Sequence, residues 1–247
     1  MFIALLTDFG TRDYFVGAMK GMIASINKDA KIIDITHEIE PQNIASASFT
    51  LRACYRNFPK KTVFVAVVDP GVGSNRRAVL VETADYYFIA PDNGLLSFVF
   101  NGAESFRVFD LNNKKYFAED VSATFHGRDI FAPVAAYLSR GIAAGRIGEE
   151  TNDFVCDSTD NTPRIIHIDR FGNLITNLVK AGLPEKFVIE INDHRIEKLQ
   201  NFFAEAEKSE LFMIFGSAGF LEIAAYKDSA QKILNTKAGQ IIHIKEL

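Results

Sequence analysis

The fold is decided by the stretch TVFVAVV at positions 62–68, which runs directly into DPGVG at positions 69–73. The run from Val63 to Val68 is apolar at every position, so it predicts a strand that is buried on both faces of a sheet. Phe2–Leu6 has the same character. Strands covered on both faces are typical of a parallel sheet with helices on either side. We therefore expect an α/β domain in the first part of the chain.

The segments around this strand alternate between strand-like and helix-like patterns. Apolar residues recur at helical spacing between the strands, for example at Ala18, Met22 and Ile26. The expected strands are Phe2–Thr7, Lys31–Ile35, Thr62–Val68, Ala78–Glu82 and Tyr86–Ile89, and the expected helices are Tyr14–Asn27, Asn43–Asn57 and Asp129–Ser139. The order βαβαβ predicts a mostly parallel sheet with flanking helices. We assign this N-terminal α/β domain to residues 1–152.

The chain changes character after the last of these helices. Glu149–Asp153 and Asp157–Pro163 are polar, rich in turn residues and without apolar period, which is typical of a linker. We place the linker at residues 153–163 and a smaller C-terminal antiparallel β domain at residues 164–247. Its expected strands are short alternating runs: Arg164–Asp169, Leu174–Val179, Lys186–Ile191, Leu211–Phe215, Phe220–Ala224 and Gln240–Ile244.

Composition and charge exclude several classes of protein. With 48% hydrophobic and 23% charged residues, the chain has the composition of a globular protein. Its 27 Lys and Arg are outnumbered by 31 Asp and Glu, giving a net charge of −4. No segment gathers the positive charge that binding to a phosphate backbone requires. We therefore expect no nucleic acid partner.

Two further features bear on the compartment. The first apolar run ends at Leu6 and has no basic residue before it, which is unlike a signal peptide, and no uninterrupted apolar run approaches the length of a membrane span. Cys54 and Cys156 lie far apart and outside any CxxC motif, which favours a reducing compartment. We expect a cytoplasmic protein without a membrane partner.

Ligands of open parallel sheets bind at the carboxyl ends of the strands, so the residues there are the first candidates for a site. They are TDFG at 7–10, DPGVGSNRR at 69–77 and APDNG at 90–94. Asp8 is placed to accept hydrogen bonds from the two hydroxyls of a ribose; the alternative is an N-cap or turn residue. The Gly71–Gly73 stretch is neither GxGxxG nor a P-loop, which favours a nucleoside-type ligand without phosphates.

A second group of candidates consists of Asp69, Arg76 and His126. Asp69 and Arg76 share one loop and are close enough in sequence to pair, while His126 lies in a turn before Gly127 at the start of an expected helix. Such a cluster can orient a water molecule; the alternative is an ion pair that only stabilises the loop. The other histidines lie within or beside expected strands, which favours a structural role: His37, His167, His194 and His243.

Metal binding has little support in the sequence. A set of hard ligands is conceivable from Asp8, Asp13, Asp69, Asp92, His126 and Asp129, but no two of them form an HxxxH, HxD or DxD pair. The one HxD motif, His167-Ile168-Asp169, lies on an expected strand of the second half. We expect no metal.

The second half contains one further candidate, the segment Asp169–Asn177. It fits a simple hairpin turn. Equally, Phe171 and Asn173 within one turn fit a purine site, where the ring stacks on the base and the amide bonds to its edge.

Six motifs in order along the chain resemble one family. They are TDFGTRD (7–13), DITH (34–37), VDPGVG (68–73), PDNGLL (91–96), FHGRD (125–129) and FGN (171–173). Together they resemble the S-adenosyl-L-methionine (SAM) hydrolase (adenosine-forming) family, also called SAM hydroxide adenosyltransferases, which is related to the fluorinase and chlorinase. The resemblance covers nearly the whole chain.

The resemblance implies an N-terminal α/β domain followed by an antiparallel β domain. It also implies a homotrimer whose ligand lies between the N-terminal domain of one subunit and the C-terminal domain of a neighbour. The implied activity is metal-independent hydrolysis of SAM to adenosine and L-methionine by attack of water or hydroxide at the ribose C5′ carbon, with no cofactor. The catalytic set of the family falls on Asp69, Arg76 and His126.

The resemblance also assigns substrate-binding roles. Asp8 falls on the ribose-binding aspartate, and Asn93 belongs to the matching PDNG motif. The remaining assignments are Phe171 and Phe203 beside the adenine, Asn173 as its hydrogen-bond partner, and Asp169 and Ser217 on the amino-acid group of methionine. Two residues depart from the family pattern, because Tyr226 stands where Asn is common and Asp228 where Gly is common. We assign no contact to that segment.

Three positions separate the chain from the halide-using relatives. Asp69 and Val72 stand where those enzymes carry Tyr and Thr, and Gly127 stands where they carry Ser; the long insertion before the fluorinase's matching turn is also missing. These departures disfavour halide chemistry. The alternatives are a SAM-dependent halogenase of the chlorinase type, a non-catalytic adenosine or SAM sensor, and a metal-dependent phosphohydrolase, which would lose activity with EDTA. A nicotinamide dehydrogenase would need the glycine fingerprint that is absent here.

Overall fold

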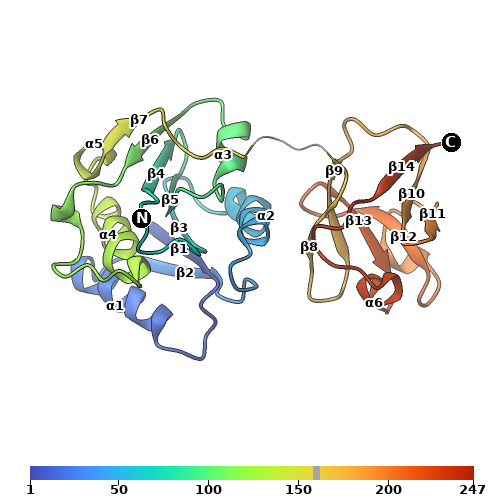
Figure 1. The fold of residues 1–247 in the computed structure, drawn as a ribbon, viewed down its shortest axis with the longest axis horizontal. Coiled ribbons are helices and arrows are strands. Elements are labelled where there is room, and N and C mark those ends of the chain that lie inside the picture. The colour runs from blue at the N-terminus through green and yellow to red at the C-terminus, as the bar shows by residue number, and fades with distance from the viewer. Residues whose placement is uncertain (158–161) are drawn as a thin grey trace. The chain divides into compact units, whose positions relative to one another are not determined.

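The computed structural model describes residues 1–157 and 162–247. The chain divides into two compact units, residues 1–158 and 159–247 (Figure 1). The linker expected at 153–163 lies partly outside the described residues. Among the described residues, no helix has the length and apolar character needed to cross a bilayer.

The N-terminal unit is built on a seven-stranded sheet of order β2-β1-β3-β5-β4-β6-β7. The strands are β1 (Phe2–Thr7), β2 (Lys31–Thr36), β3 (Val63–Val67), β4 (Ala78–Thr83), β5 (Tyr87–Pro91), β6 (Phe106–Asp110) and β7 (Glu149–Thr151). The four strands from β2 to β5 in this order are parallel, whereas β4, β6 and β7 join antiparallel. β4 and β5 form a hairpin because only a short turn connects them. The predicted α/β class with a mostly parallel centre is confirmed.

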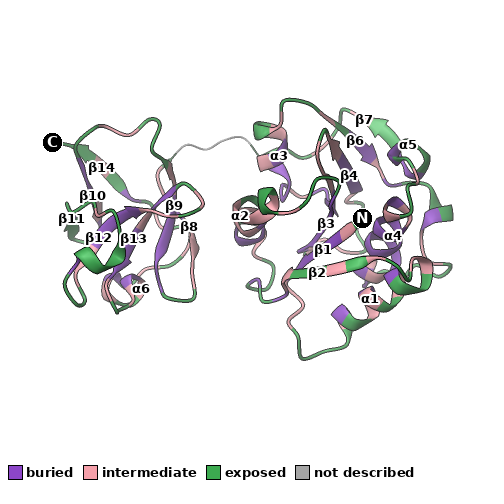
Figure 2. Ribbon diagram, turned by 180° about the vertical axis from the view of Figure 1, so that it is seen from behind, coloured by how far each residue is buried: buried purple, intermediate pink, exposed green. Residues whose placement is uncertain are grey.

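Helices cover both faces of this sheet, as Figure 1 shows. They are α1 (Phe15–Ile26), α2 (Ile44–Cys54), α3 (Ser97–Gly102), α4 (Ala132–Ser139) and α5 (Ala144–Ile147). Along β3, Val63, Val65 and Val67 belong to the core beneath α1 and α4, whereas Phe64 and Ala66 belong to the core beneath α2 and α3. The central strands are therefore buried throughout (Figure 2), as the unbroken apolar run predicts.

Several segments of the N-terminal unit differ from expectation, and α3, α5 and β6 are elements that the sequence analysis did not predict. The helix expected at Asn43–Asn57 ends at Cys54 and continues as a 3₁₀ turn over Tyr55–Asn57. The helix expected at Asp129–Ser139 begins as an α-helix only at Ala132, because residues Gly127–Phe131 form a π-helical turn. The polar segment that begins at Glu149 is not all linker: Glu149–Thr151 forms β7 and pairs with β6. An edge strand faces solvent, so its polar composition conceals it from a search for apolar periodicity.

The C-terminal unit consists of a four-stranded sheet, β12-β13-β9-β8, and a three-stranded sheet, β11-β10-β14. Its elements are β8 (Ile165–Ile168), β9 (Leu174–Val179), β10 (Phe187–Ile191), β11 (His194–Ile196), β12 (Leu211–Phe215), β13 (Phe220–Ala225), α6 (Ala230–Leu234) and β14 (His243–Glu246). All its strand pairs are antiparallel, as predicted. The strand expected at Gln240–Ile244 begins later, at His243.

Candidate active site

The candidate site of the N-terminal unit lies on the loop between β3 and β4. Asp69 follows the end of β3, and Arg76 lies just before β4. Gly73 of this loop has φ +78°, and a Cβ there would lie 2.1 Å from the carbonyl oxygen of Ala123. Glycine at this position lets the loop approach the backbone of the segment that carries His126.

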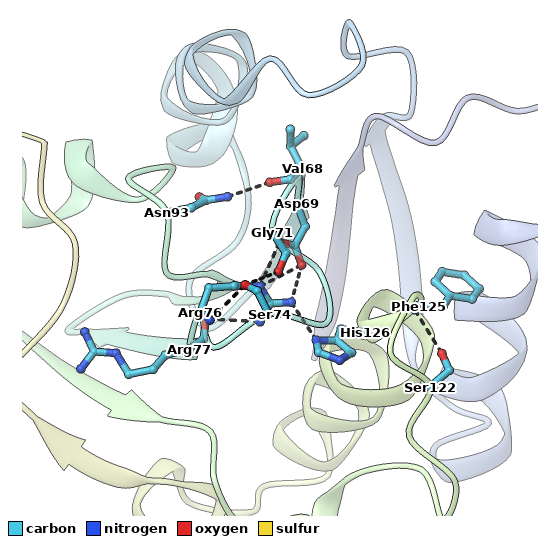
Figure 3. Close-up of polar contacts among 10 residues, drawn as sticks. All are labelled: Val68, Asp69, Gly71, Ser74, Arg76, Arg77, Asn93, Ser122, Phe125 and His126. Atoms are coloured by element: carbon cyan, nitrogen blue, oxygen red, sulfur yellow. Dashed lines mark hydrogen bonds and ion pairs between the residues drawn. The ribbon is translucent and has the colours of Figure 1, made fainter.

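The structure brings Asp69, Arg76 and His126 together (Figure 3). Arg76 Nε donates to both carboxylate oxygens of Asp69, at 2.9 and 3.0 Å, and Arg76 Nη2 also contacts Asp69 Oδ2. Arg76 Nη2 lies 2.8 Å from His126 Nδ1. The side chains of Asp69 and Arg76 are only 5% and 11% exposed, so solvent screens this pair much less than a surface pair.

Burial and the contact with Arg76 together favour the neutral form of His126. A guanidinium only donates hydrogen bonds, so His126 Nδ1 accepts and the ring proton is assigned to Nε2. Burial lowers the pKa of His126, and the positive charge of Arg76 lowers it further. His126 is therefore neutral at physiological pH and presents an Nε2–H donor.

The turn that carries His126 is held by Asp129, which is 1% exposed. Its Oδ2 accepts hydrogen bonds from the Ser122 amide at 2.9 Å and the Ser122 hydroxyl at 2.8 Å, and its Oδ1 accepts one from Arg128 Nε at 2.6 Å. Burial tends to raise the pKa of Asp129, but the bonds from Arg128 and Ser122 outweigh it and the pKa is lowered. The ionised carboxylate thus locks both ends of the turn.

A cavity of about 150 Å³ lies beside this network. Asp69 and His126 line its polar side, and the rings of Phe9, Phe15 and Phe125 line its apolar side. The rings pack edge to face, with centroids 5.8 Å apart for Phe9 and Phe125 and 5.1 Å apart for Phe15 and Phe125. Since one water occupies about 30 Å³ in the liquid, the cavity has room for water next to the two polar side chains.

Asp8 follows β1 and Asn93 follows β5, the strands on either side of β3, and both side chains bind backbone groups. Asp8 Oδ2 accepts a hydrogen bond from the Gln42 amide at 2.8 Å. Asp8 is not an N-cap, because the N-caps of α1 and α2 are Tyr14 and Asn43, but it does lie in a bend that follows β1. Asn93 Nδ2 donates to the Val68 carbonyl at 2.9 Å, which joins its turn to the end of β3 (Figure 3).

The conceivable set of hard ligands does not form one cluster. Asp92 pairs with Arg77 at 2.9 Å, whereas Asp129 pairs with Arg128. Across residues 1–157 and 162–247, no three His, Cys, Asp or Glu side chains are grouped as metal ligands would be.

His37 has the partners of a structural histidine. It is buried, its Nδ1 lies 2.9 Å from Thr7 Oγ1, and its Nε2 lies 3.1 Å from Asp34 Oδ1.

In the C-terminal unit, Asp169 and Asn173 close the hairpin turn between β8 and β9. Asp169 Oδ1 accepts from the amides of Phe171 and Asn173 at 2.8 and 2.9 Å, and Asp169 Oδ2 accepts from Asn173 Nδ2 at 2.8 Å. The ring of Phe171 at the tip is 77% exposed. The turn therefore presents a large apolar side chain to solvent at its tip.

Phe171, Asn173 and Phe203 are brought together around a pocket of about 530 Å³. Its remaining lining comes from the segment Ala225–Asp228, to which the sequence analysis assigned no contact. Ser217 lies in the turn between β12 and β13, exposed to solvent and outside the lining of this pocket.

Glu222 is a charged residue near these groups that the sequence analysis missed. A Cβ on Gly216 would lie 1.7 Å from Glu222 Oε1, so the carboxylate lies against the turn that contains Ser217. Burial raises the pKa of Glu222, and the negative charge of Asp169 raises it further. The available signal was a lone charge inside the apolar strand FLEIAA.

Two protein-family models match the chain. The model of the SAM hydroxide adenosyltransferase N-terminal domain matches residues 3–148, and that of the C-terminal domain matches residues 163–243. The chain belongs to the SAM hydroxide adenosyltransferase family. The resemblance of the six motifs is thereby confirmed.

Individual relatives agree with this membership. The family member described here is 42% identical to an (R)-S-adenosyl-L-methionine hydrolase from Methanocaldococcus jannaschii, over 94% of this chain and 91% of that protein. A fluorinase from Nocardia brasiliensis is 26% identical over 98% of this chain and 96% of its own length. A crystal structure of a protein from Thermotoga maritima matches with a TM-score of 0.91 and 36% identity, covering 98% of this chain and all of that one.

Proposed function

We propose that the protein hydrolyses SAM to adenosine and L-methionine, with the (R)-sulfonium epimer as its substrate. The observation that carries the proposal is the partly buried network of Asp69, Arg76 and His126, of which Asp69 and His126 line a small cavity. The 42% identity to a protein named (R)-S-adenosyl-L-methionine hydrolase supports the same reaction.

The reaction is an in-line displacement at the ribose C5′ carbon. The water oxygen forms a bond to C5′, and the C5′–S bond breaks with its electron pair passing to sulfur. The sulfonium leaves as the neutral thioether of methionine, and one proton of the water is released. Because the leaving group needs no proton, the site requires no general acid, and its task is to position and activate the water.

Asp69 and His126 divide this task. The carboxylate of Asp69 accepts a hydrogen bond from the water and increases its nucleophilic character. The Nε2–H of His126 donates to the water oxygen and orients its lone pair. Arg76 holds both groups through three of its hydrogen bonds, and its positive charge favours hydroxide character in the water.

The substrate-binding part of the proposal rests on groups from both units. Asp8 and Asn93 bind the ribose side, Phe171 and Phe203 enclose the adenine, and Asn173 bonds to its edge. Asp169 and Ser217 bind the amino-acid group of methionine. We propose a homotrimer in which the N-terminal unit of one subunit and the C-terminal unit of a neighbour complete each site.

We further propose that the reaction uses no metal and no other cofactor, because a neutral thioether leaves without Lewis-acid assistance. The protein is proposed to act in the cytoplasm; the distance between Cys54 and Cys156 in the sequence, outside any CxxC motif, supports a reducing compartment.

The test is to incubate the purified protein with each SAM epimer, with and without EDTA and chloride, and to separate the products by chromatography. Equal amounts of adenosine and methionine from the (R)-epimer, unaffected by EDTA, support the proposal. A product containing chlorine, 5′-chloro-5′-deoxyadenosine, would replace it with the halogenase alternative. Binding without any product would leave the sensor alternative, and loss of activity with EDTA would contradict the metal-free mechanism.

A further inference from the structure

The segment Ala225–Asp228 is a tight turn built against the pocket that Phe171 and Phe203 line. Lys227 adopts a left-handed conformation with φ 53°, and the Asp228 amide donates to the Ala225 carbonyl at 3.3 Å. The carboxylate of Asp228 accepts from the Ser209 hydroxyl and the Ser229 amide, both at 2.7 Å. Asp228 therefore fixes the turn and leaves Tyr226 as the large side chain that this segment presents.

The position of Tyr226 is fixed by its backbone and by its packing. Its amide donates to the Glu210 carbonyl at 3.3 Å, and its carbonyl accepts from the Ser209 amide at 2.9 Å. Its side chain packs against the small core formed by Ala206, Phe212, Ile214 and Ala224. A ring held in this way loses little further freedom when a ligand binds beside it.

The hydroxyl of Tyr226 is unused by the protein. Within the part of the chain that the structure describes, it has no hydrogen-bond partner, although the residue is half-buried. The neighbouring Lys227 Nζ contacts only the ring, 5.1 Å from its centroid. The hydroxyl is not one of the buried polar atoms that lack a partner, so solvent reaches it and a ligand in the pocket can replace that water.

We infer that Tyr226 is a third aromatic contact for the purine of the substrate, supplying a ring face and a hydrogen bond from its hydroxyl. The inference rests on the proposed function. It assigns a binding role to a position where this chain carries Tyr and the family pattern carries Asn. Since Tyr226 takes no part in the network of Asp69, Arg76 and His126, it acts on binding and not on the chemical step.

The experiment compares Tyr226→Ala, Tyr226→Asn and Tyr226→Phe with the wild type. The readouts are KM and kcat for SAM and the dissociation constant of adenosine by calorimetry. Removing an aromatic contact to a base weakens binding by about tenfold. We expect Tyr226→Ala and Tyr226→Asn to raise KM and the adenosine dissociation constant by about that factor, with kcat within about twofold. Tyr226→Phe keeps the ring, so its loss is expected to be only a few-fold.

The matched control is Phe202→Ala, which removes an exposed aromatic ring of the same unit that does not line the pocket. Its KM and adenosine affinity are expected to match the wild type. Wild-type KM and adenosine affinity in Tyr226→Ala and Tyr226→Asn would overturn the inference, and wild-type affinity in Tyr226→Phe would overturn the hydrogen bond. If wild-type protein does not cleave SAM, the proposed function fails, while the adenosine measurement still tests Tyr226 separately.

Discussion

The two units place their polar and aromatic groups in opposite ways. In the N-terminal unit, Asp69 and Arg76 are buried and already bonded to each other and to His126. In the C-terminal unit, Phe171 is exposed at the tip of a turn, and the pocket beside it is open. The first arrangement holds reacting groups in position before any ligand arrives, which is what positioning a water requires. The second presents apolar surface that becomes buried only when a ligand or partner covers it.

The largest expected effect comes from Asp69→Asn, which tests whether the N-terminal unit carries the chemical step. The change keeps the size of the side chain but removes the negative charge that accepts from the water and pairs with Arg76. We expect kcat to fall by about 10²- to 10⁴-fold, the usual contribution of general acid–base catalysis, while adenosine affinity stays near the wild-type value. An unchanged kcat would remove Asp69 from the catalytic set.

A second test concerns how the network is held, through Gly73→Ala. The added Cβ would meet the Ala123 carbonyl oxygen at 2.1 Å, and φ is +78°. The matched control is Gly141→Ala, where φ is +86° but no atom lies within 4 Å. Both variants carry the left-handed penalty of about 1–2 kcal/mol, so the additional loss of thermal stability in Gly73→Ala measures the close approach. Its kcat should fall as well, and equal stability of the two variants would argue against a rigid contact.

The exposed ring of Phe171 in the C-terminal unit is expected to affect substrate binding and not the chemical step. Phe171→Ala should raise KM for SAM by about tenfold with little change in kcat, because it removes a stacking surface and leaves the Asp69 network intact. Steady-state kinetics separate the two parameters. A large fall in kcat with unchanged KM would mean that the two units do not divide binding and chemistry as proposed.

The pH dependence of kcat tests the state of His126. Burial and the charge of Arg76 lower its pKa, so the neutral form that accepts from Arg76 persists below the ordinary value of 6.5. The activity should therefore fall only when the pH drops below 6.5, since protonation breaks the contact with Arg76. His126→Asn retains an acceptor for Arg76 but no titrating ring, so this acidic limb should disappear. If the His126→Asn variant loses activity over the same pH range, the fall in kcat at low pH is caused by another titrating group.

The smallest expected effect is on stability, from Glu222→Gln. A carboxyl whose pKa is raised in the folded state stabilises it at low pH, and this contribution is lost as the pH rises through the folded pKa. The variant should thus be more stable than the wild type at pH 7, by less than about 1 kcal/mol for a half-buried group, and equal to it below pH 4.5. Thermal unfolding at the two pH values measures the difference. Equal destabilisation at both would mean that the carboxylate has a favourable partner.

Patterns within one short stretch of sequence were sufficient to predict a central strand and two of the polar contacts. The apolar run at 62–68 requires a strand covered on both faces, and the spacing of Asp69 and Arg76 on one short loop brings them within reach of each other. Asp169 and Asn173 likewise close a turn through contacts four residues apart. β7 was not visible in this way, because an edge strand such as Glu149–Thr151 takes its pairing from β6 and needs no apolar alternation of its own.

The sequence by itself therefore determined the α/β and antiparallel β classes, the family, and the groups that meet along a short stretch of chain. Only the tertiary structure decided which distant groups meet. Arg76 and His126 are 50 residues apart, and the two segments that carry them also approach each other at Gly73 and Ala123. Glu222 and Tyr226 join their neighbours only through the pairing of β13 with its partner strands and the turn that follows it. The physical reason is that burial, protonation and pocket shape arise from contacts between segments that are distant in the sequence. The periodicity of one segment carries no information about those contacts.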